Sequence, residues 1–221
     1  MKKYLLYTVL IISCASSCKK DGKTTPTVHF DEIFQINFTI DNIPATKVYP
    51  KDSLNILQGY HSDLGNGNYY FGGGGFYKLD IKRSIGFQLG SAYGALITDP
   101  TGSFKAFSTL CSPGSKIYDN MALGSQTQTN RVEFSYYDEN GNEWSTTKMD
   151  LSDPAHPKPA AGPIQPTGST FIITDKKDIS LDNTTPDGVI IKGTFNCILY
   201  KWGSNDQKTV RDGTFIAAVA E

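Results

Sequence analysis

Residues 188–221 read GVIIKGTFNCILYKWGSNDQKTVRDGTFIAAVAE, and the alternation of apolar and polar residues in this stretch indicates the fold. The apolar residues of its first half share one parity, namely Val189, Ile191, Phe195, Cys197 and Leu199. A strand that buries one face requires this period of two. Gly193 interrupts the pattern, and we expect a β-bulge there. GSNDQ (203–207) predicts a hairpin turn, so the chain ends in a pair of strands.

The same period recurs through the rest of the chain. IFQINFTIDN (33–42) alternates and ends in Asp41 and Asn42, which favour a turn. Pro44 places the returning strand, IPATKVY (43–49), at a sheet margin or a bulge. Further strands are predicted in LNILQGY (54–60), FYKLDIK (76–82), IGFQLGS (85–91) and TFIITD (170–175), and a short helix in GSFKAFSTL (102–110). About ten strands with at most one short helix predict an all-β fold, either an antiparallel β-sandwich or a partly open barrel.

The segment RVEFSYYDENGNEWSTTKMD (131–150) predicts a hairpin. Asn140 and Gly141 can both take positive φ and close a two-residue type I′ turn. The resulting register pairs Tyr137 with Trp144, Glu133 with Lys148, and Arg131 with Asp150. We expect Tyr137 and Trp144 on the polar face, either as a surface that stacks on sugars or as a pair that stiffens the hairpin.

A second candidate ligand surface lies in GNGNYYFGGGGFY (65–77). Tyr69, Tyr70 and Phe71 adjoin four consecutive glycines and can form a flat binding surface or cover a sheet that the glycines thin. The four glycines lack the Gly-Lys-Ser/Thr ending of a phosphate-binding loop.

The amino-terminal segment, MKKYLLYTVLIISCASSCKKDG (1–22), carries two lysines, a short apolar run and then small residues before Cys18. The apolar run is too short to span a bilayer and suits a secretory signal peptide over residues 1–17. This order resembles bacterial lipoprotein precursors, particularly those of the Bacteroidota type. The resemblance implies acylation, such as by palmitate, at Cys18, with Cys14 as the alternative, and a flexible tether over residues 18–31. The expected location is the outer membrane, on its periplasmic or surface side.

Charge and cysteine content narrow the classes of partner. Removal of residues 1–17 leaves 19 basic against 22 acidic side chains, a net charge of about −3. The charges are scattered, which argues against nucleic-acid binding. Cys111 and Cys197 form either a disulfide in an exported protein or two buried free thiols.

We expect residues 32–221 to form one domain. Residues 152–168, SDPAHPKPAAGPIQPTG, contain five prolines and predict an extended, solvent-facing loop without ladder hydrogen bonds. The domain resembles the uncharacterised β-sandwich lipoproteins of Bacteroidota-type envelopes through two short motifs, YxDxNG at 136–141 and DGTF at 212–215. The resemblance implies a β-sandwich fold and a location in the cell envelope.

The sequence offers no catalytic motif. Its histidines, His29, His61 and His156, have no metal-ligand spacing, and no nucleophile elbow is present. We therefore predict no metal, cofactor or catalytic residue. The favoured function is a non-catalytic binding or structural module for a glycan, a peptide or an envelope protein. The alternative is an envelope hydrolase whose acid–base pair forms no sequence motif.

Overall fold

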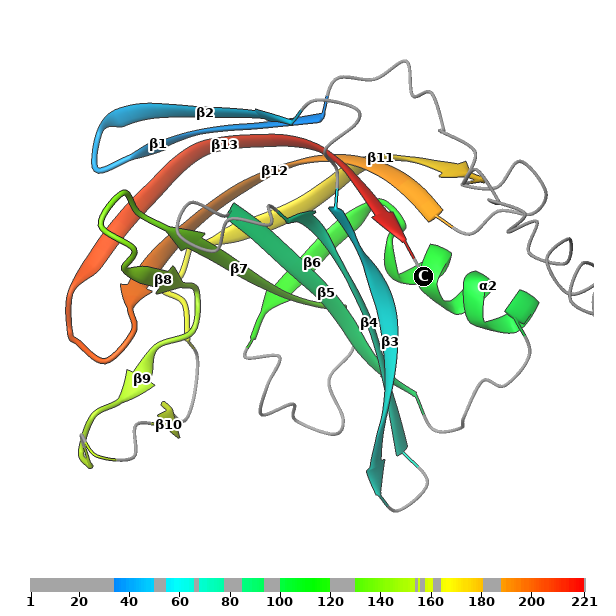
Figure 1. Ribbon diagram of the computed structural model, residues 1–221, viewed down its shortest axis with the longest axis horizontal. Coiled ribbons are helices and arrows are strands. Elements are labelled where there is room, and N and C mark those ends of the chain that lie inside the picture. Colours follow the sequence, from blue (N-terminus) through cyan, green and yellow to red (C-terminus); the bar gives the residue numbers. More distant parts are fainter. Residues whose placement is uncertain are drawn as a thin grey trace, which may run out of the picture.

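The computed structural model shows a strand-rich body with a curved upper layer, a second group of strands that crosses beneath it, and a helix at one end (Figure 1). The structure describes residues 34–49, 55–65, 68–77, 85–93, 100–119, 130–153, 155, 158–160, 164–180 and 188–220.

The elements of the described residues are β1 (Phe34–Ile40), β2 (Ile43–Tyr49), β3 (Asn55–Gly65), β4 (Asn68–Tyr77), β5 (Ile85–Tyr93), α2 (Pro100–Leu110), β6 (Gly114–Tyr118), β7 (Arg131–Tyr137), β8 (Glu143–Ser145), β9 (Met149–Asp150), β10 (Lys158–Pro159), β11 (Thr170–Ile179), β12 (Gly188–Lys201) and β13 (Gln207–Ala220). One 11-stranded sheet has the order β2-β1-β13-β12-β11-β6-β7-β5-β4-β3, and β9 pairs separately with β10.

The predicted all-β class is confirmed, and the described residues contain one short helix, α2. In Figure 1 the strands β2, β1, β13, β12 and β11 form the upper layer, and β5, β4 and β3 cross beneath it. β8 pairs with both β7 and β12 and so joins the layers at one end. The sheet is mixed rather than wholly antiparallel, because β6 and β7 run parallel.

The first predicted hairpin is also confirmed. β1 and β2 pair along their length, and β2 is the margin of the sheet, as Pro44 predicts. The turn residues Asp41 and Asn42 have φ of 49° and 67°. Positive φ at both positions is the geometry of a type I′ turn, whose twist matches that of the strands.

The centre of the upper layer is a reciprocal contact between glycine and phenylalanine. Gly193 of β12 lies opposite Phe215 of β13, and Phe195 of β12 lies opposite Gly213 of β13. A Cβ atom at Gly213 would lie 2.5 Å from the Phe195 ring, and one at Gly193 would lie 2.5 Å from Cζ of Phe215. Each ring therefore covers the glycine of the partner strand, and both glycines are needed for space.

The two rings also connect the layers. The Phe195 ring centre lies 4.9 Å from that of Phe134 on β7, and the Phe215 ring centre lies 5.2 Å from that of Phe87 on β5. Burial of such a side chain contributes roughly 1.5–3 kcal/mol, and close ring pairs add about 0.5–1.5 kcal/mol. This aromatic cluster is the core that holds the two groups of strands together.

The β-bulge expected at Gly193 is not in β12, which pairs with β13 through that residue. The register shifts instead in the neighbouring strand β11, between Ile173 and Asp175, directly beside Gly193. The glycine interrupts the apolar pattern because a ring lies over it, and the irregularity falls on the strand next to it.

A second bulge, in β13, shapes the outer face of the sheet. β13 has one more residue than its neighbours at Asp212, where φ is 53°. The Asn196 side chain accepts a hydrogen bond from the Asp212 N–H (3.0 Å). Side chains along a regular strand alternate between its two faces, and the extra residue shifts this alternation by one position. As a result, Val210 and Phe215 both face the core, while Arg211 faces outward.

The proline-rich loop is more closely attached to the body than predicted. Lys158 and Pro159 form a short ladder with β9, and Ile164 is buried. The Gln165 amide NH₂ donates to the carbonyls of Thr146 and Ile198 (both 2.8 Å), and its oxygen accepts from the Ile198 N–H (2.8 Å). Ile198 lies between the residues of β12 that pair with β11 and with β8, so this side chain fills a gap in the ladder.

We expect Gly213→Ala to destabilise the protein by about 3 kcal/mol, because the new methyl group overlaps both the Phe195 ring and the backbone of β12. Urea unfolding followed by circular dichroism measures the effect. Thr214→Ala, at an exposed position in the same strand, is the control; it removes only a long hydrogen bond from Asn37 (3.5 Å) and should change stability by about 1 kcal/mol or less. Equal stability of the two variants would show that the ring does not occupy this space.

Candidate functional site

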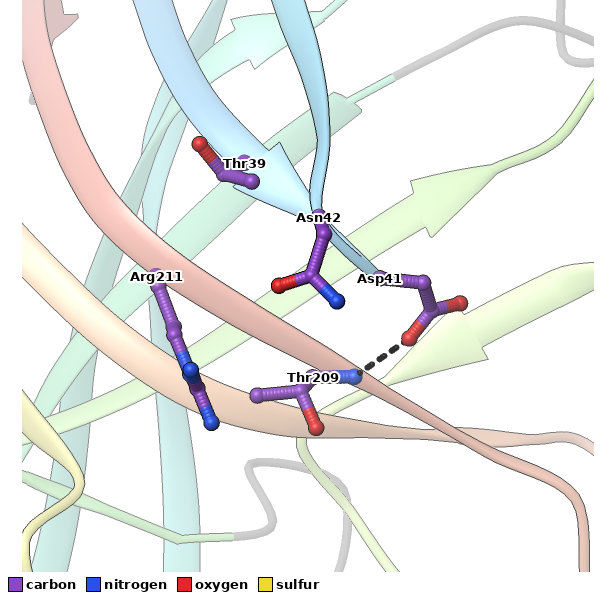
Figure 2. Close-up of a pocket in the computed structure, with 5 residues that line it drawn as sticks. All are labelled: Thr39, Asp41, Asn42, Thr209 and Arg211. Atoms are coloured by element: carbon purple, nitrogen blue, oxygen red, sulfur yellow. Dashed lines mark hydrogen bonds between the residues drawn. The ribbon is translucent and has the colours of Figure 1, made fainter.

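A polar pocket of about 190 Å³ lies on the outer face of the sheet, where the β1–β2 turn meets β13 (Figure 2). Its lining residues are Thr39, Asp41, Asn42, Thr209 and Arg211. All five carry hydrogen-bonding side chains, so the pocket suits a polar ligand.

The turn is fixed to β13 by Asp41. The Asp41 N–H donates to the Thr209 carbonyl (3.0 Å), and its carboxylate Oδ1 accepts from the Thr209 N–H (3.0 Å). The second carboxylate oxygen lies 3.4 Å from Nζ of Lys208. These contacts hold one wall of the pocket in place and engage both oxygens of Asp41.

Arg211 forms the opposite wall (Figure 2). It lies opposite Thr39 in the β1–β13 register, immediately before the bulge at Asp212, and it is exposed. Among the described residues, no ion pair includes Arg211. The bulge therefore presents a guanidinium whose five N–H donors are open to a ligand.

The predicted exposed pair of Tyr137 and Trp144 is wrong. Only Gly141 of the turn has positive φ, and its N–H donates to the Asp138 carbonyl (2.9 Å), so the loop is one residue longer than predicted. This shift places Tyr136 opposite Trp144 and Tyr137 opposite Glu143. A one-residue slip moves each side chain to the other face, and Trp144 is only 6% exposed.

The charge pairs predicted from the same register are also wrong. Arg131 is fully buried, and its Nε lies 2.7 Å from Asp119. Glu133 accepts a hydrogen bond from the Thr147 hydroxyl (2.7 Å), and Asp150 lies 3.9 Å from Nζ of Lys158. These partners differ because the pairing with β7 covers only the three residues of β8, and two of them, Trp144 and Ser145, also pair with β12.

Trp144 instead belongs to a chain of contacts that joins the two hairpins. Its indole N–H donates to Oδ2 of Asp138 (3.0 Å), and Nζ of Lys208 lies 4.7 Å from the centre of its rings. Lys208 also approaches Asp41, so a cation–π contact and an ion pair connect β8 with the pocket wall.

Asp138 is the acidic anchor of the hairpin. Partial burial opposes its ionisation, but hydrogen bonds from Asn142, Trp144 and the Asn140 backbone outweigh that effect and lower its pKa from 3.8 to about 2. The same contacts explain the longer loop, because the carboxylate accepts from both the backbone and the side chain of Asn142.

For the second predicted surface, Tyr69 to Phe71, the structure describes the backbone alone. Tyr69, Tyr70 and Phe71 lie in β4 between β3 and β5, and their side chains are outside the described residues. Gly72 to Gly75 are also in β4, so these glycines form part of a strand. The suggested lipid-attachment residues, Cys18 and Cys14, lie outside the described residues as well.

Cys111 and Cys197 are buried free thiols, which is the second of the two predicted alternatives. Burial raises the pKa of each thiol from 9.0 to about 12. A nucleophilic cysteine requires the thiolate form, so both residues behave as small apolar groups of the core.

A polar cluster at the end of α2 has a structural explanation. Nζ of Lys176 donates to the carbonyl (3.2 Å) and hydroxyl (2.5 Å) of Ser108, and that hydroxyl donates to Asp178 (3.1 Å). Lys116 donates to the Leu110 carbonyl (2.6 Å), and burial lowers its pKa. The last turn of α2 has no basic residue of its own, so lysines from β6 and β11 cap it.

Comparison with protein-family models, curated proteins and solved structures finds no match to this chain. Among the described residues, no group of three or more histidine, cysteine or acidic side chains could hold a metal ion. Nor does the described part of the chain contain a helix with the length and apolar character needed to cross a bilayer.

Sequence reasoning recognised the turn at Asp41 and Asn42 and the DGTF motif but did not connect them. Thr39, Thr209 and Arg211 were therefore missed as site residues. Asp212 within DGTF was an available signal, because aspartate tolerates the left-handed conformation of a bulge.

We expect Asp138→Asn to destabilise the protein by about 1 kcal/mol at about pH 6, a value reduced for the partial exposure of the carboxylate. Because the folded pKa is about 2 and the unfolded value is 3.8, this contribution is present above pH 3.8 and is lost as pH falls toward 2. Urea unfolding at about pH 6 and about pH 3 should therefore show a smaller difference from the wild type at the lower pH. Glu139→Gln is the exposed control, and a difference that stays constant with pH would contradict this role of Asp138.

Proposed function

We propose that this protein is a lipid-anchored, non-catalytic module of the cell envelope that binds a glycan in the pocket beside the β1–β2 turn. The order of basic residues, apolar run, small residues and Cys18 supports the anchor. Lipid on that sulfur holds the protein at a bilayer surface, with residues 18–31 as the tether to the β-sheet domain. Each buried methylene of an acyl chain contributes about 0.8 kcal/mol, and stable anchoring takes more than one chain.

The observation that carries the binding role is the set of polar groups at the pocket. Thr39, Asn42 and Thr209 provide hydroxyl and amide groups that both donate and accept hydrogen bonds. Sugar hydroxyls need partners of this kind. Because Asp41 ties the turn to β13, the groups are held before the ligand arrives, which lowers the entropy cost of binding.

The anchor is tested by expressing the full chain in a bacterium that exports and acylates lipoproteins. We expect mass spectrometry to find an acylated amino terminus at Cys18 and the protein to sediment with membranes. Cys18→Ala should abolish both, whereas Cys14→Ala should leave both unchanged. An unmodified terminus downstream of residue 18 would contradict the proposal, and acylation at Cys14 would move the attachment site.

The binding role is tested with a panel of neutral and acidic polysaccharides and the full chain in detergent. Thr39→Trp places an indole in the pocket and should abolish binding of the polysaccharides that the wild type retains. Thr174→Trp, at an exposed threonine in β11, is the matched control and should bind normally. Equal binding by both variants would show that the pocket is not the site.

A further inference from the structure

The charges around the pocket are not balanced. The carboxylate of Asp41 is the acidic group of the lining, and both of its oxygens are engaged, one by the Thr209 N–H at 3.0 Å and the other by Nζ of Lys208 at 3.4 Å. Lys208 compensates the charge of Asp41. Arg211, which forms no ion pair among the described residues, leaves one positive charge that faces the space between the walls (Figure 2).

The shape of that positive group restricts the ligand. A guanidinium presents parallel N–H donors that match the two oxygens of a carboxylate, and such charge-assisted pairs are about twice as strong as neutral hydrogen bonds. The surrounding groups of Thr39, Asn42 and Thr209 are neutral and suit hydroxyls. A ligand that satisfies both requirements carries a carboxylate and several hydroxyls on one small unit.

The size of the pocket leads to the same class. Its volume of about 190 Å³ is below the roughly 300–1,000 Å³ of sites that enclose a drug-sized ligand. It therefore accommodates one unit of a longer chain, with the neighbouring units on the exposed outer face of the sheet.

We propose that the pocket recognises a uronic-acid unit of an acidic polysaccharide, with its carboxylate on Arg211 and its hydroxyls on Thr39, Asn42 and Thr209. This inference rests on the proposed binding function and names its ligand class. It assigns the selectivity for acidic over neutral sugars to Arg211, the exposed residue that precedes the β13 bulge.

The test measures binding of trigalacturonate and galactotriose to the full chain in detergent by isothermal titration calorimetry. Both sugars are built from rings of the galacto configuration, but trigalacturonate carries carboxylates where galactotriose carries neutral hydroxymethyl groups. We expect trigalacturonate to bind at least about ten-fold more tightly. Arg211→Gln should reduce that affinity to the level of galactotriose, while Lys192→Gln, which removes one positive charge elsewhere on the same face, should leave it unchanged.

Three results would overturn the inference: equal affinity for the two sugars, unchanged trigalacturonate binding by Arg211→Gln, or displacement of trigalacturonate by equimolar acetate or phosphate, which would indicate a site for simple anions. Equal affinity combined with loss of both sugars in Thr39→Trp would reject the acidic ligand and retain the glycan-binding function. If the wild type bound neither these sugars nor any polysaccharide of the panel, both proposals would fail.

Discussion

The mutual cover of two phenylalanine rings and two glycines across β12 and β13 is the constraint on which the rest of the structure depends. Phe195 lies over Gly213 and Phe215 over Gly193, so the register of these long strands is fixed twice. A slip of one residue would bring each ring against a side chain on the wrong face. The same rings then meet Phe134 and Phe87 from the strands beneath, and the register thereby determines how the two layers meet.

The pocket follows from that register. Val210 and Phe215 of β13 both face the core, although residues an odd number of positions apart in a regular strand point to opposite faces. The extra residue of the bulge at Asp212 brings both side chains onto the same face. The bulge turns Arg211 outward beside β1, while Asp41 ties the β1–β2 turn to Thr209. Core packing on one face and a polar, positively charged recess on the other are thus two consequences of one irregularity in β13.

Structural features set by residues close together in the chain were predictable from the sequence, whereas the pairing of strands that are distant in the chain was not. The turn at Asp41 and Asn42 and the alternation in β12 depend on residues close together in the chain. The register of the second hairpin was wrong because the Asp138 carboxylate binds the Asn142 backbone and stabilises a longer loop, and because β8 has β12 as a second partner. The role of Gln165 depends on a gap in the ladder of β12 that no sequence pattern reveals.

The candidate site was missed for a similar reason. Its residues come from β1 and from β13, which are separated by most of the chain and become neighbours only in the folded sheet. The sequence contains each half of the site, but topology brings the halves together. By contrast, Tyr137 and Trp144 were expected to be exposed because a local register paired them, but the longer loop shifts that register by one residue, and Trp144 is buried.

The central claim, that reciprocal ring-on-glycine packing fixes the register of β12 and β13, is tested most directly by nuclear Overhauser spectroscopy of the isotopically labelled protein. The structure predicts strong contacts from the Phe195 ring to the Gly213 Hα protons and from the Phe215 ring to those of Gly193, with both glycine signals shifted upfield by the rings. Glycine Hα signals at ordinary positions, with ring contacts to Thr194 or Thr214 instead, would contradict this register.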